Sequence, residues 1–83
     1  MTTNALAAAA DKLADLLLEG GKQGLMLPDY VLASVWALIG ISYTVTRHPE
    51  SAEQPIPGMI ADLDQTHATL AATIAEHNRR CGR

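Results

Sequence analysis

The chain has no phenylalanine, and its three aromatic residues, Tyr30, Trp36 and Tyr43, make up only 4% of its 83 residues. Its hydrophobic share is nevertheless 48%, because alanine is abundant, and alanine buries little area. Each large aliphatic side chain that becomes buried contributes roughly 1.5–3 kcal/mol. A short chain with few large side chains is therefore predicted to form one small domain, residues 1–83. Its marginal core would gain from a second subunit.

Cysteine is nearly absent, since Cys81 is the only one and no intramolecular disulfide can form. Pairing of two copies through Cys81 remains an open alternative. The N-terminus lacks the basic start of a signal peptide, and Asp11 and Asp15 interrupt its apolar residues. Both features favour a cytoplasmic location.

A positive excess is also absent, because the net charge is −3 and the pI is about 5.4. Nucleic-acid-binding domains usually carry such an excess, since contacts with phosphate dominate their affinity. The exception is local, where Arg79, Arg80 and Arg83 gather at the C-terminus. We interpret these arginines as solvated charges that favour the end of a helix. Binding of nucleic acid or a nucleotide through them is the least favoured alternative.

Motifs for catalysis and cofactor binding are missing as well. The glycines Gly20, Gly21 and Gly24 follow no predicted strand and lack the spacing of a phosphate-binding loop. Asp62 and Asp64 stand two residues apart, so they do not face each other on a helix. We therefore expect neither an enzyme nor a cofactor.

Possible metal ligands are few. His77 and Cys81 are four residues apart and share one face of a helix. His67 lies roughly 15 Å from His77 along that helix, so it cannot reach the same ion. Zinc sites use three or four ligands, and we expect no metal site within one chain.

The longest uncharged stretch runs from Tyr30 to Thr46, seventeen residues in all. A helix that is apolar all round is either buried on every side or spans a membrane. Spanning needs about 17–25 residues, so this stretch is at the lower limit. Polar residues within it, such as Ser34 and Ser42, and a mean hydropathy of only +0.08 for the chain favour a buried helix. A small single-span membrane protein using residues 30–46 remains the alternative.

Three helices are predicted, at about residues 3–19, 28–47 and 58–80. Thr3 or Asn4 suits the N-cap of the first helix, and Gly20-Gly21 suits its end. Pro28 favours the first turn of the second helix, and the proline at position 49 ends it. The alternation of residues 39–46 also fits a strand that would pair across a dimer, and this alternative stays open.

The predicted fold is all-α, a three-helix up-down bundle with the nearly all-apolar second helix at its centre, completed by dimerisation. The predicted core comprises large side chains from all three helices, namely Leu13, Leu17, Val35, Trp36, Leu38, Ile39, Leu63, Leu70 and Ile74.

The third helix carries a heptad-like seam in which His67 and His77 each follow two aliphatic residues. A polar residue in such a seam most often fixes the register of the helices. Because histidine changes charge near neutral pH, sensing of pH is the alternative role for both residues.

The second helix carries a face of small residues at helical spacing, Ala33, Ala37 and Gly40, which would let two helices approach closely. Two other helices cannot cover all of its apolar surface, and soluble monomers rarely keep such a patch exposed. We therefore predict a homodimer. The predicted interface consists of Val31, Ala33, Trp36, Ala37, Gly40 and Tyr43.

These features together favour a soluble, non-enzymatic module that binds another protein through apolar helix surfaces. The small size and acidic, helical character suit an accessory or inhibitor protein of a phage or mobile element, and equally a small adaptor. Nothing in the residues identifies the protein target.

Overall fold

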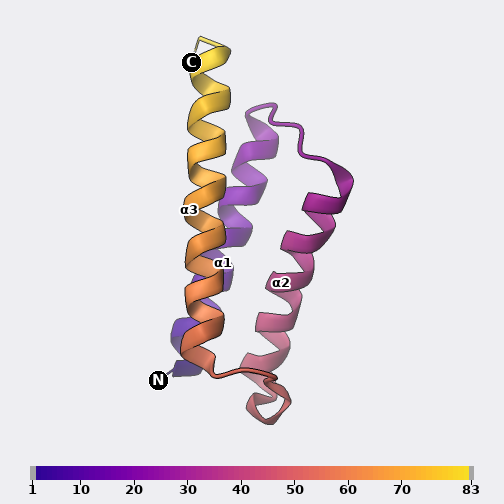
Figure 1. The fold of residues 1–83 in the computed structure, drawn as a ribbon, viewed down its shortest axis with the longest axis vertical. Helices are drawn as coiled ribbons and strands as arrows, with labels where there is room; N and C mark the ends of the chain where they lie inside the picture. The colour runs from indigo at the N-terminus through magenta and orange to yellow at the C-terminus, as the bar shows by residue number, and fades with distance from the viewer. Residues whose placement is uncertain (1, 83) are drawn as a thin grey trace.

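The computed structural model describes residues 2–82 and is all-α, with no strand in that range (Figure 1). Helix α1 spans Thr2–Lys22, α2 spans Asp29–Arg47 and α3 spans Ile56–Arg80. A single 3₁₀ turn, η1, spans Pro49–Ser51 in the connection between α2 and α3. Helices that follow each other in the sequence run in opposite directions, and the two ends of the chain lie at opposite ends of the molecule (Figure 1).

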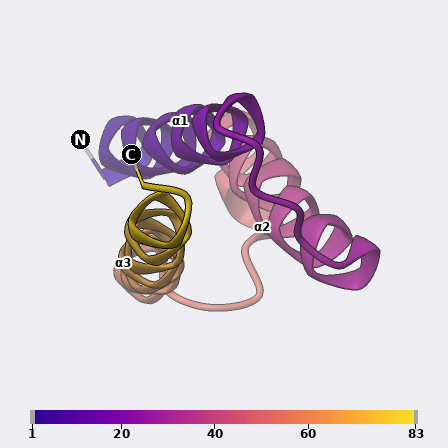
Figure 2. The ribbon, with the colours of Figure 1, turned by 90° about the horizontal axis from the view of Figure 1, so that it is seen from above.

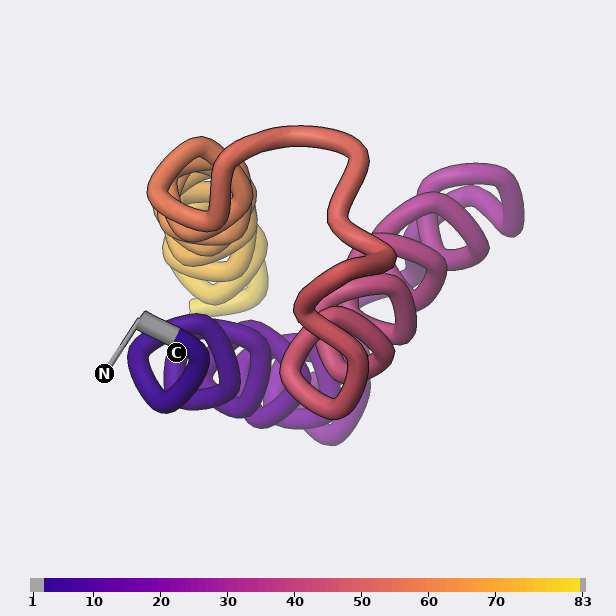
Figure 3. The backbone as a smooth tube through the Cα atoms, turned by 90° about the horizontal axis from the view of Figure 1, so that it is seen from below, coloured from indigo at the N-terminus to yellow at the C-terminus, as the bar shows by residue number. Residues whose placement is uncertain are grey.

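Helix α1 lies between the other two helices. It packs most extensively on α3 and then on α2, whereas α2 and α3 contact each other very little. Viewed along the long axis, α3 and α2 flank α1 and leave an open angle between them (Figures 2 and 3). The molecule is accordingly elongated, with extents of 46 × 23 × 16 Å.

The core forms where the aliphatic stripe of α1 meets the stripe of α3. Leu6 and Leu13 of α1 and Leu63 of α3 are fully buried, because residues three, four or seven apart share one side of a helix. The remaining buried apolar residues are Ala9, Ala10, Leu17, Ile39, Val45, Met59, Leu70 and Ile74.

The prediction that the second helix is the central and most buried one is wrong for the single chain. Ile39 is buried as expected, but Val35 and Leu38 are only half-buried and Trp36 is 42% exposed. Because its apolar residues surround the helix, one neighbour can bury only one side of α2. In α1 the large side chains form a stripe, so two neighbours can cover them.

The first helix does not end at Gly20-Gly21 as predicted, because Gly20 serves the packing of α1 on α3. A Cβ atom at Gly20 would lie 3.0 Å from Cδ1 of Ile74, so glycine allows this close approach. The helix ends instead at Lys22, and Gly24, two residues beyond it, has a φ of 85°. The amides of Leu25 and Gly24 donate to the carbonyls of Gly20 and Gly21, which is the Schellman pattern of a helix end.

The other helix boundaries agree closely with the predictions. Pro28 directly precedes α2, and Pro49 begins the 3₁₀ turn after it. Residues 39–46 are helical, so the strand alternative is wrong. Helix α3 begins two residues earlier than expected, since Pro57 fits its first turn. Thr3 and Asn4 lie inside α1 and do not precede it as caps.

Candidate protein interface

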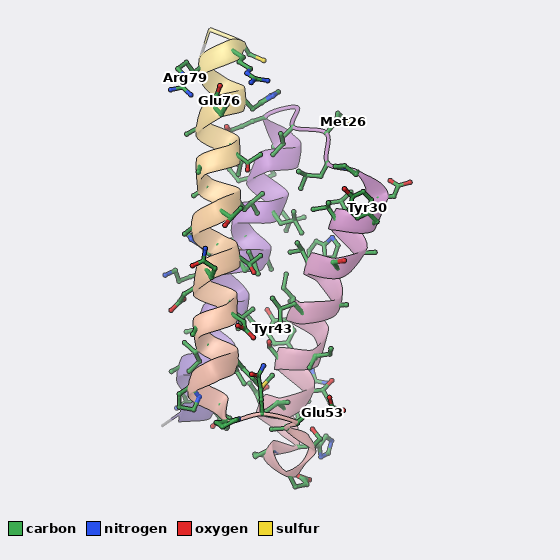
Figure 4. All side chains as sticks on the ribbon, viewed as in Figure 1. Met26, Tyr30, Tyr43, Glu53, Glu76 and Arg79 are labelled. Atoms are coloured by element: carbon green, nitrogen blue, oxygen red, sulfur yellow. The ribbon has the colours of Figure 1, made fainter. Side chains whose placement is uncertain are left out.

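The outer side of α2 is an exposed surface that carries no charge between Asp29 and Arg47. Among its residues only Ile39, Ser42 and Val45 are buried. Tyr30, at the start of the helix, is 75% exposed and Ile41 is 57% exposed. Figure 4 shows Tyr30 and the preceding Met26 at the end of α2 that lies farthest from α3.

By length and composition alone, α2 is apolar enough to cross a membrane. Its most apolar stretch of 18 residues has a mean hydropathy of 1.2, and only 17% of that stretch is buried inside the molecule. A core helix of a soluble protein would be mostly buried. The rest of the described chain therefore leaves most of the apolar surface of α2 uncovered.

The predicted interface residues do not all lie on one surface. Ala33, Ala37 and Gly40 are exposed together, and a Cβ atom at Gly40 would meet nothing within 4 Å. Trp36 is also exposed, whereas Val31 and Tyr43 are half-buried. The small-residue face predicted from the sequence is thus present and open.

Tyr43 reaches across to α1, where its hydroxyl donates a hydrogen bond to Oδ1 of Asp11. This bond, together with partial burial and the charges of Asp11 and Asp15, raises the pKa of Tyr43 above its usual value. The sequence did not indicate this contact, because the two residues are far apart in the chain and neither belongs to a motif.

A groove of about 220 Å³ separates α2 from α3. Val31 and Val35 form one wall, Thr69 and Thr73 form the other, and Leu70 also lines it. Val31, predicted at the dimer interface, therefore faces α3 across this groove.

Of the two histidines singled out in α3, His77 contacts the segment that follows α1. Its Nε2 lies 3.0 Å from the carbonyl oxygen of Gln23, just beyond α1. The neighbouring Asn78 donates from Nδ2 to Oε1 of Gln23 over 2.6 Å. These two contacts set where the C-terminal end of α3 lies on α1. His67 is half-buried and remains a candidate for register or pH sensing.

The possible metal ligands His77 and Cys81 lie near each other, with Sγ 3.8 Å from Nε2 of the histidine. Within residues 2–82, no three histidine, cysteine, aspartate or glutamate side chains gather around one point.

The C-terminal arginines are engaged within α3. Arg80 donates from Nε to Oε1 of Glu76 over 3.1 Å, and Arg79 forms an ion pair with the same carboxylate. Glu76 and Arg79 lie side by side in Figure 4. Arg83 lies outside the described residues. The pairing with Glu76 reduces the positive charge available to nucleic acid.

The chain matches no known protein-family model, no curated protein and no solved structure. The candidate interface is therefore inferred from the structure alone, and its main feature is the outer side of α2.

Proposed function

We propose that this protein is a non-enzymatic, cytoplasmic protein-binding module that works as a homodimer. The observation that carries the proposal is the exposed outer side of α2, which carries no charge between Asp29 and Arg47. In this proposal the three helices form an up-down bundle that a second copy completes. The dimer then acts as an accessory, inhibitor or adaptor for another protein.

The surface area of the chain supports association. A monomer of 8.8 kDa is expected to expose about 4,800 Å². This chain exposes 5293 Å², roughly 500 Å² more. Its radius of gyration is 13.6 Å, against about 12 Å for a compact domain of this length. A typical stable interface covers about 800 Å² per partner, so the excess is a large part of what a dimer requires.

A second candidate function is a small membrane protein, favoured by the length and exposure of α2. Two observations support the soluble dimer more strongly. Ser34, Ser42 and Thr44 lower the apolar content of α2, and such polar residues add little to membrane insertion. The contact of Tyr43 with Asp11 also holds α2 against a helix that carries several charges.

Fractionation and light scattering test the proposal together. We expect the protein in the soluble fraction without detergent, and a mass twice that of the chain at micromolar concentration. Recovery only with detergent would establish the membrane function instead. A single 8.8 kDa species would refute the dimer.

A matched pair of variants locates the interface. Gly40→Leu should weaken the dimer while leaving helix content intact, because it places a large side chain on the small face of α2. Gly21→Leu is the control, since Gly21 is also helical and a Cβ there meets nothing within 4 Å. A dimer unaffected by Gly40→Leu would move the interface to α3. An affinity pull-down from the native host, with Gly40→Leu as the comparison, would identify the protein target.

A further inference from the structure

The outer side of α2 carries a regular seam. Its members are spaced four, three, four, three and four residues apart, which is the heptad spacing of a coiled coil. They are Asp29, Ala33, Trp36, Gly40, Tyr43 and Arg47. All are exposed except Tyr43, which is half-buried at the edge nearest α1. A second helix could therefore pack along the full length of this seam.

The two charges of the seam stand at its two ends. Asp29 and Arg47 begin and end α2, and eighteen residues correspond to about five helical turns, so both point to the same side. They are roughly 27 Å apart along the helix. Neither forms an ion pair with any residue in the range 2–82. Between them the seam is uncharged.

When a second copy of α2 packs against this seam in the opposite direction, complementary side chains meet. A twofold axis at Leu38 places Asp29 opposite the partner's Arg47 at both ends. It also places Trp36 opposite the partner's Gly40, and Ala33 opposite the partner's Tyr43. Each layer then joins opposite charges or a large side chain with a small one, as knobs-into-holes packing requires.

We propose that α2 pairs with α2 of a second copy in antiparallel orientation, centred on Leu38. This inference rests on the homodimer proposed above and specifies its geometry. A parallel pair is disfavoured because it would place Trp36 against the partner's Trp36 and Asp29 against the partner's Asp29. Trp36, the largest side chain of the molecule and 42% exposed, gains its cover at the open position of Gly40.

Charge reversal tests the ends of the seam. Asp29→Arg and Arg47→Asp each place like charges at both ends of an antiparallel homodimer. Since exposed ion pairs are individually weak, each variant should dimerise about tenfold less tightly. An equimolar mixture of the two variants restores both ion pairs and should recover the affinity of the unchanged protein. A homodimer that neither substitution weakens would overturn the antiparallel pairing.

Disulfide trapping tests orientation independently of charge, in a Cys81→Ser background. A chain with Ala33→Cys mixed with a chain with Tyr43→Cys should cross-link, because those positions face each other. Each chain alone should remain uncross-linked, since its own cysteines lie roughly 15 Å apart along the pair. Cross-linking of each chain alone, with none between the two, would establish a parallel pair and overturn the proposal.

The two proposals fail in distinguishable ways. A monomer by light scattering refutes the homodimer and its geometry together. A dimer that trapping shows to be parallel, or that shows no cross-link at either position, refutes the antiparallel seam and leaves the homodimer standing.

Discussion

Helices α1 and α2 are similar in length and differ in what covers them. Helix α2 is the more apolar of the two, yet only three of its residues are buried. Helix α1 carries several charges, yet Leu6, Ala10 and Leu13 are entirely inaccessible to solvent. The difference is one of arrangement, because a stripe of leucines can be covered by two neighbours and a uniformly apolar surface cannot. The apolar content of a helix indicates how much of its surface favours burial. Whether the rest of the chain can bury that surface depends on whether the apolar side chains form a stripe.

The largest effect should come from breaking the stripe of α1. Leu13→Ala removes a fully buried side chain from the centre of the core and should lower the free energy of unfolding by about 2–5 kcal/mol. The corresponding change in α2, Ile41→Ala, should cost at most about 1 kcal/mol, because Ile41 is 57% exposed and alanine favours helix. Urea titration of both variants measures the comparison. Equal losses would show that α2 is as well covered as α1.

Intermediate effects are expected from the adjacent glycines of α1. Gly20→Leu should destabilise the fold by roughly 1–3 kcal/mol, since its side chain would collide with Ile74. Gly21→Ala should raise the free energy of unfolding by about 0.5–1 kcal/mol, because alanine favours helix and this site is open. The two changes are read from the same thermal unfolding curves. A gain in stability from Gly20→Leu would show that α1 and α3 are not in close contact there.

The smallest effect concerns the link between α1 and α2. The pKa of Tyr43 is raised in the folded state, so its hydroxyl stabilises the fold below the ordinary tyrosine pKa. That contribution is lost as the pH rises through the raised pKa, and the free energy of unfolding should fall above about pH 10. Tyr43→Phe should show a smaller fall over the same range, with Tyr30→Phe as the control. Identical pH profiles for all three proteins would show that the bond to Asp11 contributes nothing.

Much of this fold is predictable from local signals. The prolines at 28 and 49 indicate where α2 begins and ends, because the ring restricts φ and removes a donor. The spacing of Leu13 and Leu17 in α1, and of Leu63 and Leu70 in α3, indicates their buried sides.

What escapes prediction depends on tertiary contact. Whether Gly20 ends α1 or allows Ile74 to approach is decided by α3, which local propensity does not include. The hydrogen bond between Tyr43 and Asp11 likewise exists only once α1 and α2 are packed. Which helix is central also depends on the packing of the other two. The small face of Ala33, Ala37 and Gly40 was predictable, because its spacing alone defines it.

The packing of α1 mainly on α3 bears on how the protein is made. Of these three helices α1 leaves the ribosome first and has its main partner in α3, so its leucine stripe lacks that partner until α3 has been synthesised. During that interval the apolar α2 has also emerged, with no cover beyond α1. Such exposed surfaces invite aggregation of nascent chains. A premature stop before Ile56 would therefore release a helical hairpin of α1 and α2 that lacks the core formed with α3. Chaperones would bind such a product, or proteases would degrade it.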